Sequence, residues 1–481
     1  MITIEDIIEI LKNQNVSSEK LEEVRKSYEL AKEIHKNQYR QSGEPYITHP
    51  LHVAYNLLNM EVYDADSISA ALLHDTIEDA EIEFTKEDVA EQINPTVAEL
   101  VDGVTKMRRM NFSTTSEQAF ANTRKIINGL TKDVRIIMIK LADRLHNMST
   151  LEFKKPRKQK ENAIETMELF VPLSLSIGAY QVKNQLEDLS LQYIEPYEYQ
   201  KIKEQKDSLQ AKKEESLQEI AYKTRKILEE KYIPYDIIFR TQTISTIYKK
   251  LKKGYKMENI YDLFYLKILV HEIEDCYQTL CIVHKNNPPI NGRFKDYIYN
   301  PRTNFYQSLH TTVSDNNNNL AKVKIRTFDM DKVAAYGIPA YWNIKNGMTK
   351  EETQEIIRQK CQFAKKLTEI DESYQDNREF FKQIKKELLS EHVYAYSHNG
   401  DIIELPAGST ALDFACQVFP DLIDQMTGVL VNGKEAPLDY VLDNNDRVQV
   451  LTDGKINHDN WEKYATTSSA KQKIKLLNRQ N

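Results

Sequence analysis

The chain has 481 residues, of which 41% are hydrophobic, and it carries a formal net charge of −7. This length predicts roughly two to four globular domains, and the modest acidity argues against a protein that coats nucleic acid. No apolar stretch is long enough to cross a membrane. The N-terminus lacks a signal-peptide pattern and the four cysteines lack zinc-finger spacing, so we expect a cytoplasmic protein with reduced thiols.

The first predicted domain, residues 1–195, is expected to be all-helical, because its apolar residues keep helical spacing. Four potential metal ligands are spread over it: His49, the doublet His74–Asp75, and Asp143. A mixed set of histidines and carboxylates suits a divalent ion such as Mn²⁺, Fe²⁺ or Zn²⁺ that is held for hydrolysis. A His-Asp doublet alone is a weak motif that is more often structural. Its combination with His49 and Asp143 favours a metal site.

The doublet lies in a stretch that predicts one helix from Ala65 to Ala80. Glu78 follows His74 by four residues, and Asp79 follows Asp75 by four. This spacing predicts that each carboxylate lies above one ligand on the same helix face. One helix is therefore expected to offer both metal ligands and candidate groups for proton transfer.

Asp143 follows the apolar run 136–142 and is expected near the end of a buried helix. An unpaired carboxylate in such a place is costly, so it needs a partner. A metal ion is one such partner, and a structural salt bridge to the neighbouring Arg144 is the alternative.

Residues 196–230 predict a connecting helix with a solvated face, because acids and bases alternate along it. Short strand-like runs separated by turn signals follow in residues 231–345 and predict a mixed α/β domain. A charged helical linker is expected at 346–390. Residues 391–453 predict a small β-rich module that opens with a hairpin around Asn399–Gly400. The remaining residues, 454–481, are expected to form a C-terminal tail.

The segments around His49, His74–Asp75 and Asp143 resemble the hydrolase half of the RelA/SpoT homologue family, which makes and destroys the alarmone (p)ppGpp. The α/β domain resembles the family's synthetase through the motifs at 292–298 and 306–312, and the residues from Glu404 to Ala415 resemble a TGS domain. The resemblance covers almost the whole chain. It implies an all-α HD-type hydrolase domain, a mixed α/β nucleotidyltransferase-like domain and a small β-grasp TGS domain.

The resemblance also implies a chemistry for the first domain, the removal of the 3′-pyrophosphate of (p)ppGpp. One Mn²⁺ ion would be held by His49, His74, Asp75 and Asp143. Glu78 and Asp79 match the family's paired acids, which steer or deprotonate water or protonate the leaving oxygen. Substrate contacts are implied for Arg40, Ser42, Asn147, Lys154 and Arg157.

Some residues near this site carry weaker expectations. Residues 153–160 read as a cationic loop that suits the 5′-phosphates, although an exposed basic loop is the plain alternative. Gln41 stands where the family usually has a lysine. His146 is expected to be structural, bonded to backbone, and not a metal ligand.

The α/β domain keeps part of the family's nucleotide site but departs from it at a decisive position. Matching residues are Arg240, Lys250, Asp262, Lys295, Asn304, His310 and Tyr306, the aromatic on which guanine stacks in the family. Lys322 replaces a glutamate that is thought to hold Mg²⁺, and a lysine cannot bind that ion. We therefore expect no Mg²⁺ here, no alarmone synthesis, and an Asp262 without its partner. Further departures are Gln242, Lys267, Phe305, Ala335 and Tyr341.

Strand alternation places Lys322, Lys324 and Arg326 on one face, where three cations can hold an anion without metal. The hypothesis is that the remnant binds a regulatory guanine nucleotide or packs as a lever on the hydrolase, with simple decay as the alternative.

The leading interpretation is a Mn²⁺-dependent (p)ppGpp 3′-pyrophosphohydrolase of the stringent response. The alternatives are a bifunctional synthetase and hydrolase, a regulatory guanine-nucleotide-binding protein with a partner on the TGS domain, and a hydrolase of another 3′-phosphorylated nucleotide such as NADPH. No direct binding of nucleic acid is expected.

Overall fold

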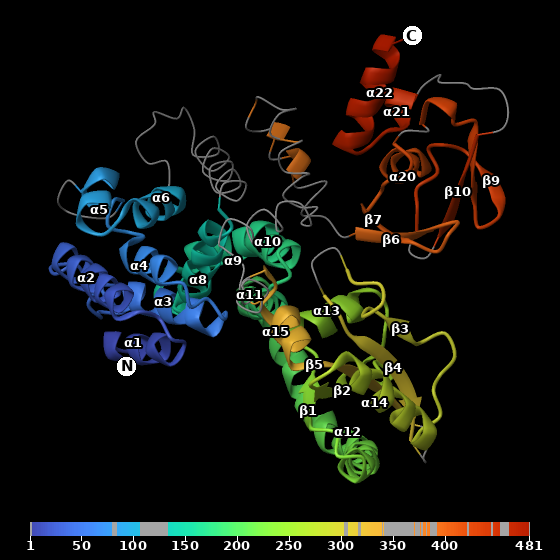
Figure 1. Ribbon diagram of the computed structural model, residues 1–481, viewed down its shortest axis with the longest axis horizontal. Helices are drawn as coiled ribbons and strands as arrows, with labels where there is room; N and C mark the ends of the chain where they lie inside the picture. Colours follow the sequence, from blue (N-terminus) through green and yellow to red (C-terminus); the bar gives the residue numbers. More distant parts are fainter. Residues whose placement is uncertain are drawn as a thin grey trace. The chain divides into compact units, whose positions relative to one another are not determined.

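The computed structural model (Figure 1) describes the chain except for residues 1, 79–83, 106–132, 303–305, 316–318, 339, 341–369, 371–375, 377–378, 381, 385–391, 421–422, 444–445, 453–460 and 481. Its contacts divide into two compact units, residues 1–105 with 135–354 and residues 106–134 with 355–481. None of the described helices combines the length and apolar character that a membrane span requires.

The first unit begins with a helical domain that ends at Ile194. Its α-helices are α1 Ile4–Asn13, α2 Ser18–Ile34, α3 Thr48–Asn59, α4 Ala65–Leu73, α5 Lys86–Gln92, α6 Pro95–Val104, α8 Arg135–Ser149, α9 Pro156–Glu165, α10 Val171–Ser176 and α11 Tyr180–Ile194. A 3₁₀ turn, η1 Leu151–Phe153, precedes α9, and a π-helical turn, η2 Thr166–Phe170, follows it.

Helix α4 lies at the centre of this domain, since all nine of its residues are buried. It packs against α2, α3 and α6, and α3 packs against α8. The predicted helix from Ala65 to Ala80 is wrong at its C-terminal end, because α4 ends at Leu73 and His74 is its C-cap. Thr76 donates twice to the carbonyl oxygen of Leu73, from its backbone N–H at 3.0 Å and from its hydroxyl at 2.6 Å. A turn therefore follows the helix.

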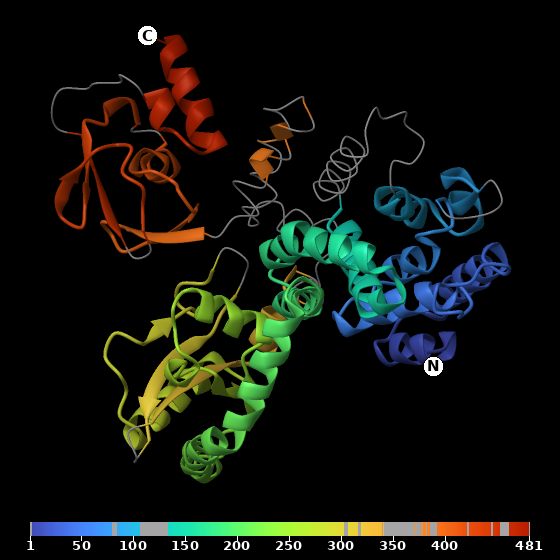
Figure 2. The same ribbon diagram turned by 180° about the vertical axis from the view of Figure 1, so that it is seen from behind.

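The second domain of this unit is a five-stranded sheet with helices. The long helix α12 Pro196–Glu230 leads into it and runs along its side (Figure 2). The strand order is β1-β2-β5-β4-β3, in which only β2 and β5 pair in parallel. The elements are β1 Tyr235–Thr241, α13 Ile244–Lys252, η3 Met257–Asn259, β2 Phe264–Val270, α14 Ile273–Asn286, β3 Lys295–Asp296, β4 Leu309–Ser314, β5 Leu320–Thr327 and α15 Phe328–Tyr336.

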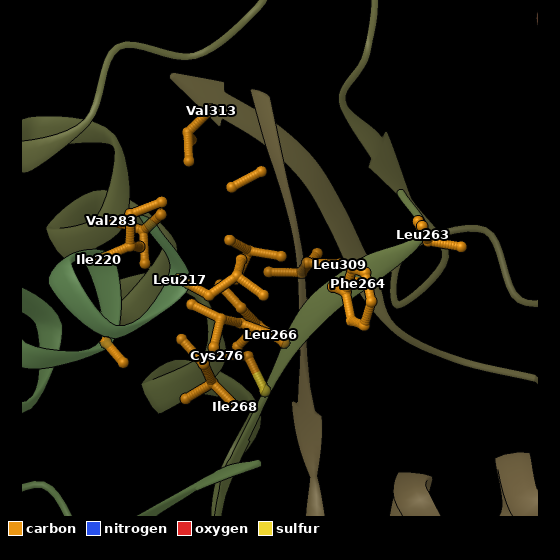
Figure 3. Close-up of a cluster of buried hydrophobic side chains, with 14 of the residues drawn as sticks. Leu217, Ile220, Leu263, Phe264, Leu266, Ile268, Cys276, Val283, Leu309 and Val313 are labelled. Atoms are coloured by element: carbon orange, nitrogen blue, oxygen red, sulfur yellow. The ribbon is translucent and has the colours of Figure 1, made fainter. Parts of the chain in front are cut away.

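The two faces of this sheet differ in character. Residues such as Leu266, Ile268 and Leu309 pack with Leu217 of α12 and Val283 of α14 into one apolar core (Figure 3). The alternate residues of β2 and β5 point to the other face, because side chains of a strand alternate. That face carries Tyr265, Lys267, Lys322, Lys324 and Arg326, paired in register as Tyr265 with Lys322 and Lys267 with Lys324. The predicted alternation along β5 is therefore confirmed.

A buried ionic cluster joins the helical domain to the sheet domain. The fully buried Glu187 of α11 accepts from Lys183 at 2.8 Å, from Lys249 of α13 at 2.6 Å and from the Ser245 hydroxyl at 3.2 Å. Although burial acts to raise it, the pKa of Glu187 is lowered by the two ammonium groups. The carboxylate of Asp188 accepts the backbone N–H of Ser245 at 2.8 Å at the start of α13. The two domains thus share polar groups that neither can satisfy alone.

Backbone contact reinforces this junction. Gly337 follows α15 with a φ of +69°, and the backbone N–H of Ile338 donates to the carbonyl oxygen of Ile177 at 3.0 Å. A Cβ atom built on Gly337 would lie 2.0 Å from the same oxygen. Both the left-handed conformation and the close approach require glycine here.

The second unit contains a small sheet of order β7-β6-β10-β8-β9. Its elements are β6 His392–Ser397, β7 Ile402–Pro406, α20 Ala411–Val418, η4 Ile423–Gln425, β8 Gly428–Val431, β9 Lys434–Ala436, β10 Arg447–Leu451, α21 Trp461–Tyr464 and α22 Ser468–Gln480. The predicted hairpin around Asn399–Gly400 is confirmed, since β6 and β7 pair antiparallel across it. The described residues of the expected tail form α21 and α22, and Trp461 and Ile474 are buried in the same core as Phe414 of α20.

Candidate metal centre and the adjoining cleft

The four ligands predicted from the sequence lie together. His49 comes from the first turn of α3, His74 and Asp75 from the end of α4, and Asp143 from α8. Nε2 of His49 lies 3.3 Å from Oδ1 of Asp143 and 3.5 Å from Oδ2 of Asp75. Nε2 of His74 lies 3.8 Å and 3.3 Å from the same two oxygens. Three helices thus aim two imidazole nitrogens and two carboxylates at one point.

The orientation of the His74 ring leaves one nitrogen unused. Its Nδ1 bonds the carbonyl oxygen of Ala71 at 2.8 Å, which assigns the proton to Nδ1 and the lone pair to Nε2. In the described part of the chain that buried Nε2 has no hydrogen-bond partner. A buried lone pair beside two carboxylates is satisfied by a cation, so these residues fit a bound metal ion.

The protonation states at this point also suit a cation. Burial acts to raise the pKa of Asp75, but the nearby His74 and His49 outweigh it and the pKa falls to about 2. Burial likewise opposes ionisation of Asp143, yet Lys140, whose Nζ lies 3.5 Å from Oδ2, helps to hold its pKa well below the usual range. Burial lowers the pKa of His49. Ionised carboxylates and neutral imidazole are the forms that bind metal.

Arg144 is not the partner of Asp143. Its guanidinium bonds Glu165 at 2.9 Å and lies over the ring of Phe170 at 4.0 Å. The structural salt bridge that the sequence left open as an alternative is therefore wrong.

A second layer of side chains holds the ligands. The Tyr46 hydroxyl donates to Oδ2 of Asp75 at 2.8 Å, and the Asn147 amide donates to Oδ1 of Asp143 at 2.5 Å. Arg40 donates to the Asn147 oxygen at 3.3 Å. Sequence reasoning missed Tyr46, although it stands only three residues before His49 in the chain. Asn147 lies one turn after Asp143, as predicted. Its amide nitrogen donates to Asp143 and its amide oxygen accepts from Arg40.

His146 contacts a ligand, not the backbone as expected. Its Nδ1 lies 2.7 Å from Nδ1 of His49, and its ring stacks on His52 with centroids 4.6 Å apart. Burial, followed by the neighbouring His49, lowers the pKa of His146 to about 3. A neutral His146 can therefore accept the Nδ1 proton of His49, which leaves Nε2 of His49 free for a metal.

Three further residues were predicted for this site: Glu78, Asp79 and Ser42. Glu78 is half-buried in the turn after α4, and its backbone N–H bonds the carbonyl of Asp75 at 3.2 Å. Asp79 lies outside the described residues. The Ser42 hydroxyl turns to Glu44 at 3.3 Å. Because α4 ends at Leu73, the predicted placement of Glu78 above His74 on one helix is wrong.

The cationic loop predicted at 153–160 is a 3₁₀ turn followed by the start of α9. Lys154 is half-buried at its beginning. Arg157 bonds Glu161 of its own helix at 2.8 Å with its side chain 89% exposed. Its phosphate-binding role stays a prediction.

A cleft of about 1560 Å³ opens between the two domains of the first unit. It is lined by His52 and His146 from the helical domain and by the polar face of β2 and β5. Arg240, from β1, and Arg302 also border it. The cleft is therefore lined by part of the predicted nucleotide site, namely Arg240, Lys295, Tyr306, His310 and Lys322, but Lys250 and Asp262 are not among its lining residues.

In this region Asp262, which has no glutamate partner at position 322, is paired with two lysines. It forms an ion pair with Lys250 through Oδ1, and Nζ of Lys322 lies 3.3 Å from Oδ2. Gln242 donates to Oδ2 at 3.4 Å. Burial acts to raise the pKa of Asp262, but the bond from Lys250 and the charge of Lys322 lower it. Ammonium groups occupy both oxygens that a metal would need.

Tyr306 is enclosed. It is 8% exposed, and its hydroxyl lies 2.7 Å from Nε2 of His310. The rings of Tyr180 and Tyr297 meet it edge-on, with centroids 5.7 and 5.9 Å away, and Arg302 lies 5.3 Å from its centroid. The stacking surface for guanine expected from the sequence is therefore covered by side chains.

The other residues predicted for the nucleotide site of the sheet domain do not lie in one cluster. Arg240 and Lys295 lie exposed on β1 and β3. Lys267 bonds Asp331 at 2.7 Å. Asn304, Phe305 and Tyr341 lie outside the described residues.

Comparison with known proteins agrees with this architecture. Residues 27–179 match the HD domain, 239–349 the region found in RelA / SpoT proteins, and 393–452 the TGS domain. The predicted order of an all-α HD-type domain, an α/β domain and a TGS domain is thereby confirmed. The match to the HD domain, together with the histidine and aspartate cluster, indicates a divalent-metal site.

Three relatives are named guanosine-3′,5′-bis(diphosphate) 3′-pyrophosphohydrolase. The chain is 36% identical to the one from Haemophilus influenzae over 93% of its own length and 66% of the relative. It is 37% identical to the one from Aquifex aeolicus, with coverages of 94% and 64%, and 34% identical to the one from Vibrio cholerae, with coverages of 98% and 67%. The chain thus spans just under two thirds of the length of the first two.

Proposed function

The chain belongs to the RelA/SpoT family, and from this premise we propose that it removes the 3′-pyrophosphate of (p)ppGpp, giving GDP or GTP and pyrophosphate, in the stringent response. The observation that carries the proposal is the cluster of His49, His74 and Asp143, with Asp75 within 3.5 Å of both imidazole Nε2 atoms and a buried Nε2 of His74 left unsatisfied among the described residues. Relatives that carry the hydrolase name support it.

We propose that these four residues hold one Mn²⁺ ion, which when bound lowers the pKa of a water molecule and offsets the charge of the pyrophosphate. The chain's own residues prepare the site. Tyr46 and Asn147 fix one oxygen of each aspartate, so the carboxylates keep their direction. Second-layer bonds of this kind orient metal ligands and tune their basicity.

The reaction breaks the ester bond between the 3′-oxygen and phosphorus. Water supplies a hydroxyl group to phosphorus and a proton to the leaving oxygen. We propose Glu78 and Asp79 as the groups that move this proton, because they follow the ligand doublet directly. Arg40, Ser42, Asn147, Lys154 and Arg157 are proposed to contact the nucleotide.

We further propose that the sheet domain does not synthesise alarmone. Lys250 and Lys322 pair with both oxygens of Asp262, so this carboxylate offers no free oxygen to Mg²⁺. A cytoplasmic location is proposed from the free thiols of Cys276, Cys281 and Cys416.

The test is incubation of the full chain with ppGpp and Mn²⁺, with GDP and pyrophosphate measured separately. The variant Asp75→Asn keeps the size of the side chain but removes a ligand charge, and we expect it to lose at least about a hundredfold in rate. Asp236→Asn, the same change at an exposed position of β1, is the matched control and keeps the activity. Unchanged activity in Asp75→Asn would contradict the metal assignment, and a preference for NADPH would contradict the substrate.

A further inference from the structure

The polar face of β2 and β5 concentrates positive charge in the cleft. Nine lysines and arginines line the cleft, against three aspartates and glutamates. Three of the cations, Lys322, Lys324 and Arg326, stand on consecutive outward positions of β5. A walled cavity with such a surplus attracts anions more strongly than an open surface does.

Two of the three cations on β5 have an acidic partner among the described residues, but the central one, Lys324, does not. Lys322 pairs with Asp262, while Lys267 and Arg326 share Asp331 at 2.7 and 2.5 Å. Lys324, between them, lies over the ring of Tyr265 at 4.3 Å. No carboxylate of the described chain lies within ion-pair distance of its Nζ.

A second group on the same face is also unsatisfied. Arg326 is 9% exposed, and its buried Nε has no hydrogen-bond partner among the described residues. An uncompensated ammonium and a neighbouring donor without an acceptor are costly in a protein interior. A ligand with several acceptor oxygens and more than one negative charge would remove both costs.

We propose that this face binds the pyrophosphate group, free or as part of a nucleotide, without a divalent metal ion and without recognition of a base. Lysine acts as a point charge and arginine as a directional donor toward phosphate oxygens. A metal bridge has no place here, because Lys250 and Lys322 already hold both oxygens of Asp262. Tyr306, the ring expected to stack on a base, offers no open face because it is enclosed.

The site is separate from the proposed hydrolase reaction and does not depend on it. Its residues come from the sheet domain, whereas the metal ligands come from α3, α4 and α8. Binding measured in the presence of a chelator therefore distinguishes this site from the metal site of the helical domain. A chelator removes binding of pyrophosphate through a metal ion in the helical domain but leaves an all-protein site intact.

The experiment is calorimetric titration of the full chain with pyrophosphate in the presence of EDTA. Wild type is expected to bind, and Lys324→Met to bind at least about tenfold more weakly, since a charge-assisted contact is lost. Lys285→Met, the same change at an exposed residue of α14 outside the cleft, is the control and binds as wild type. Removal of an uncompensated cation is not expected to unfold the domain, and the melting temperature of Lys324→Met checks this.

Nucleotides in the same chelating buffer identify the source of the phosphate. Competition of ATP and GTP with pyrophosphate at similar concentrations supports recognition of the pyrophosphate group alone. A guanine nucleotide that binds far more tightly than ATP and pyrophosphate overturns the base-independent site. Binding that requires Mg²⁺ or Mn²⁺, or a Lys324→Met protein that binds as wild type, overturns the proposal.

Discussion

Lys322 of β5 donates to Asp262, which lies just before β2, with Nζ 3.3 Å from Oδ2. Lys250 pairs with the other oxygen of the same carboxylate. The aspartate is nearly buried, with 8% of its side chain exposed. A buried carboxylate with two ammonium partners is electrostatically complete. It has no remaining need for the divalent ion that a phosphoryl-transfer site uses.

The first prediction concerns synthesis. We expect no transfer of pyrophosphate from ATP to GDP or GTP by wild type, measured with labelled ATP. Lys322→Glu would bring a second carboxylate beside Asp262, so its thermal midpoint is expected to fall without metal and to recover with Mg²⁺, because ligand binding stabilises the folded state. Lys285→Glu, on the exposed surface of α14, shows no such recovery. Transfer activity in wild type would contradict the assignment.

His146 provides the second prediction. Its Nδ1 lies 2.7 Å from Nδ1 of His49, a proposed metal ligand, and can accept the proton of that nitrogen. Such contacts typically change metal affinity by about 10- to 100-fold. His146→Leu is therefore expected to weaken Mn²⁺ binding by that factor, and His146→Gln, which keeps an acceptor, by less. The measurement is the affinity for Mn²⁺ itself, by paramagnetic resonance of the free ion.

The control for this series is His52→Gln. His52 stacks on His146 but bonds the Thr48 carbonyl at 2.7 Å and does not touch a ligand. Equal losses in His52→Gln and His146→Leu would show a general effect of packing and not one on the orientation of His49.

The third prediction tests the junction of the two domains of the first unit. Gly337→Ala places a Cβ 2.0 Å from the carbonyl oxygen of Ile177 and forces a left-handed alanine. We expect a loss of at least about 3 kcal/mol, since a backbone clash adds to the conformational cost. Gly254→Ala shares the positive φ of +89° but meets nothing within 4 Å, so it should lose only about 1 kcal/mol.

Scanning calorimetry of the two variants in the full chain separates the cost of the backbone clash from the cost of the positive φ. A Gly337→Ala protein as stable as Gly254→Ala would mean that the contact with Ile177 yields easily, and that the two domains are not held there.

The fold and the clustering of the four candidate metal ligands could be predicted from the sequence because they rest on patterns within single segments. Alternation along β5 follows directly from the order of its residues, and the convergence of His49, His74, Asp75 and Asp143 came from long motifs in an ordered series. The end of α4 could not be predicted, because residues 74–80 have acceptable helical character. The two bonds of Thr76 to the carbonyl of Leu73 end the helix, and they do not follow from spacing.

Long-range pairing explains the other failures. Lys250 reaches Asp262 over 12 positions and Lys322 over 60, so neither pair has a signal in a single sequence. Tyr306 is covered partly by Tyr180, which belongs to the helical domain. The expectation of an open aromatic surface failed because tertiary packing, not residue type, decides exposure.

Lys324 gives the last prediction, a pH dependence of stability. Burial, then the charges of Lys322 and Arg326, lower its pKa from 10.5 to about 7. Asp262 acts in the opposite direction and Arg302 adds to the lowering, while the Tyr265 ring and His310 complete its charged and aromatic surroundings. The folded protein therefore holds fewer protons than the unfolded chain between about pH 7 and pH 10.5.

Stability must rise with pH in that window, by at most about 1.4 kcal/mol per unit from this group, because the unfolded chain binds the extra proton. Below pH 7 both states are protonated and the group adds no slope. Thermal unfolding of wild type and Lys324→Met from pH 6.5 to 9.5 measures it: the variant should be the more stable at pH 7, with the difference shrinking as pH rises. Parallel curves would show that Lys324 has an ordinary pKa. Added pyrophosphate should flatten the wild-type slope, since a bound anion restores the charged form of the lysine.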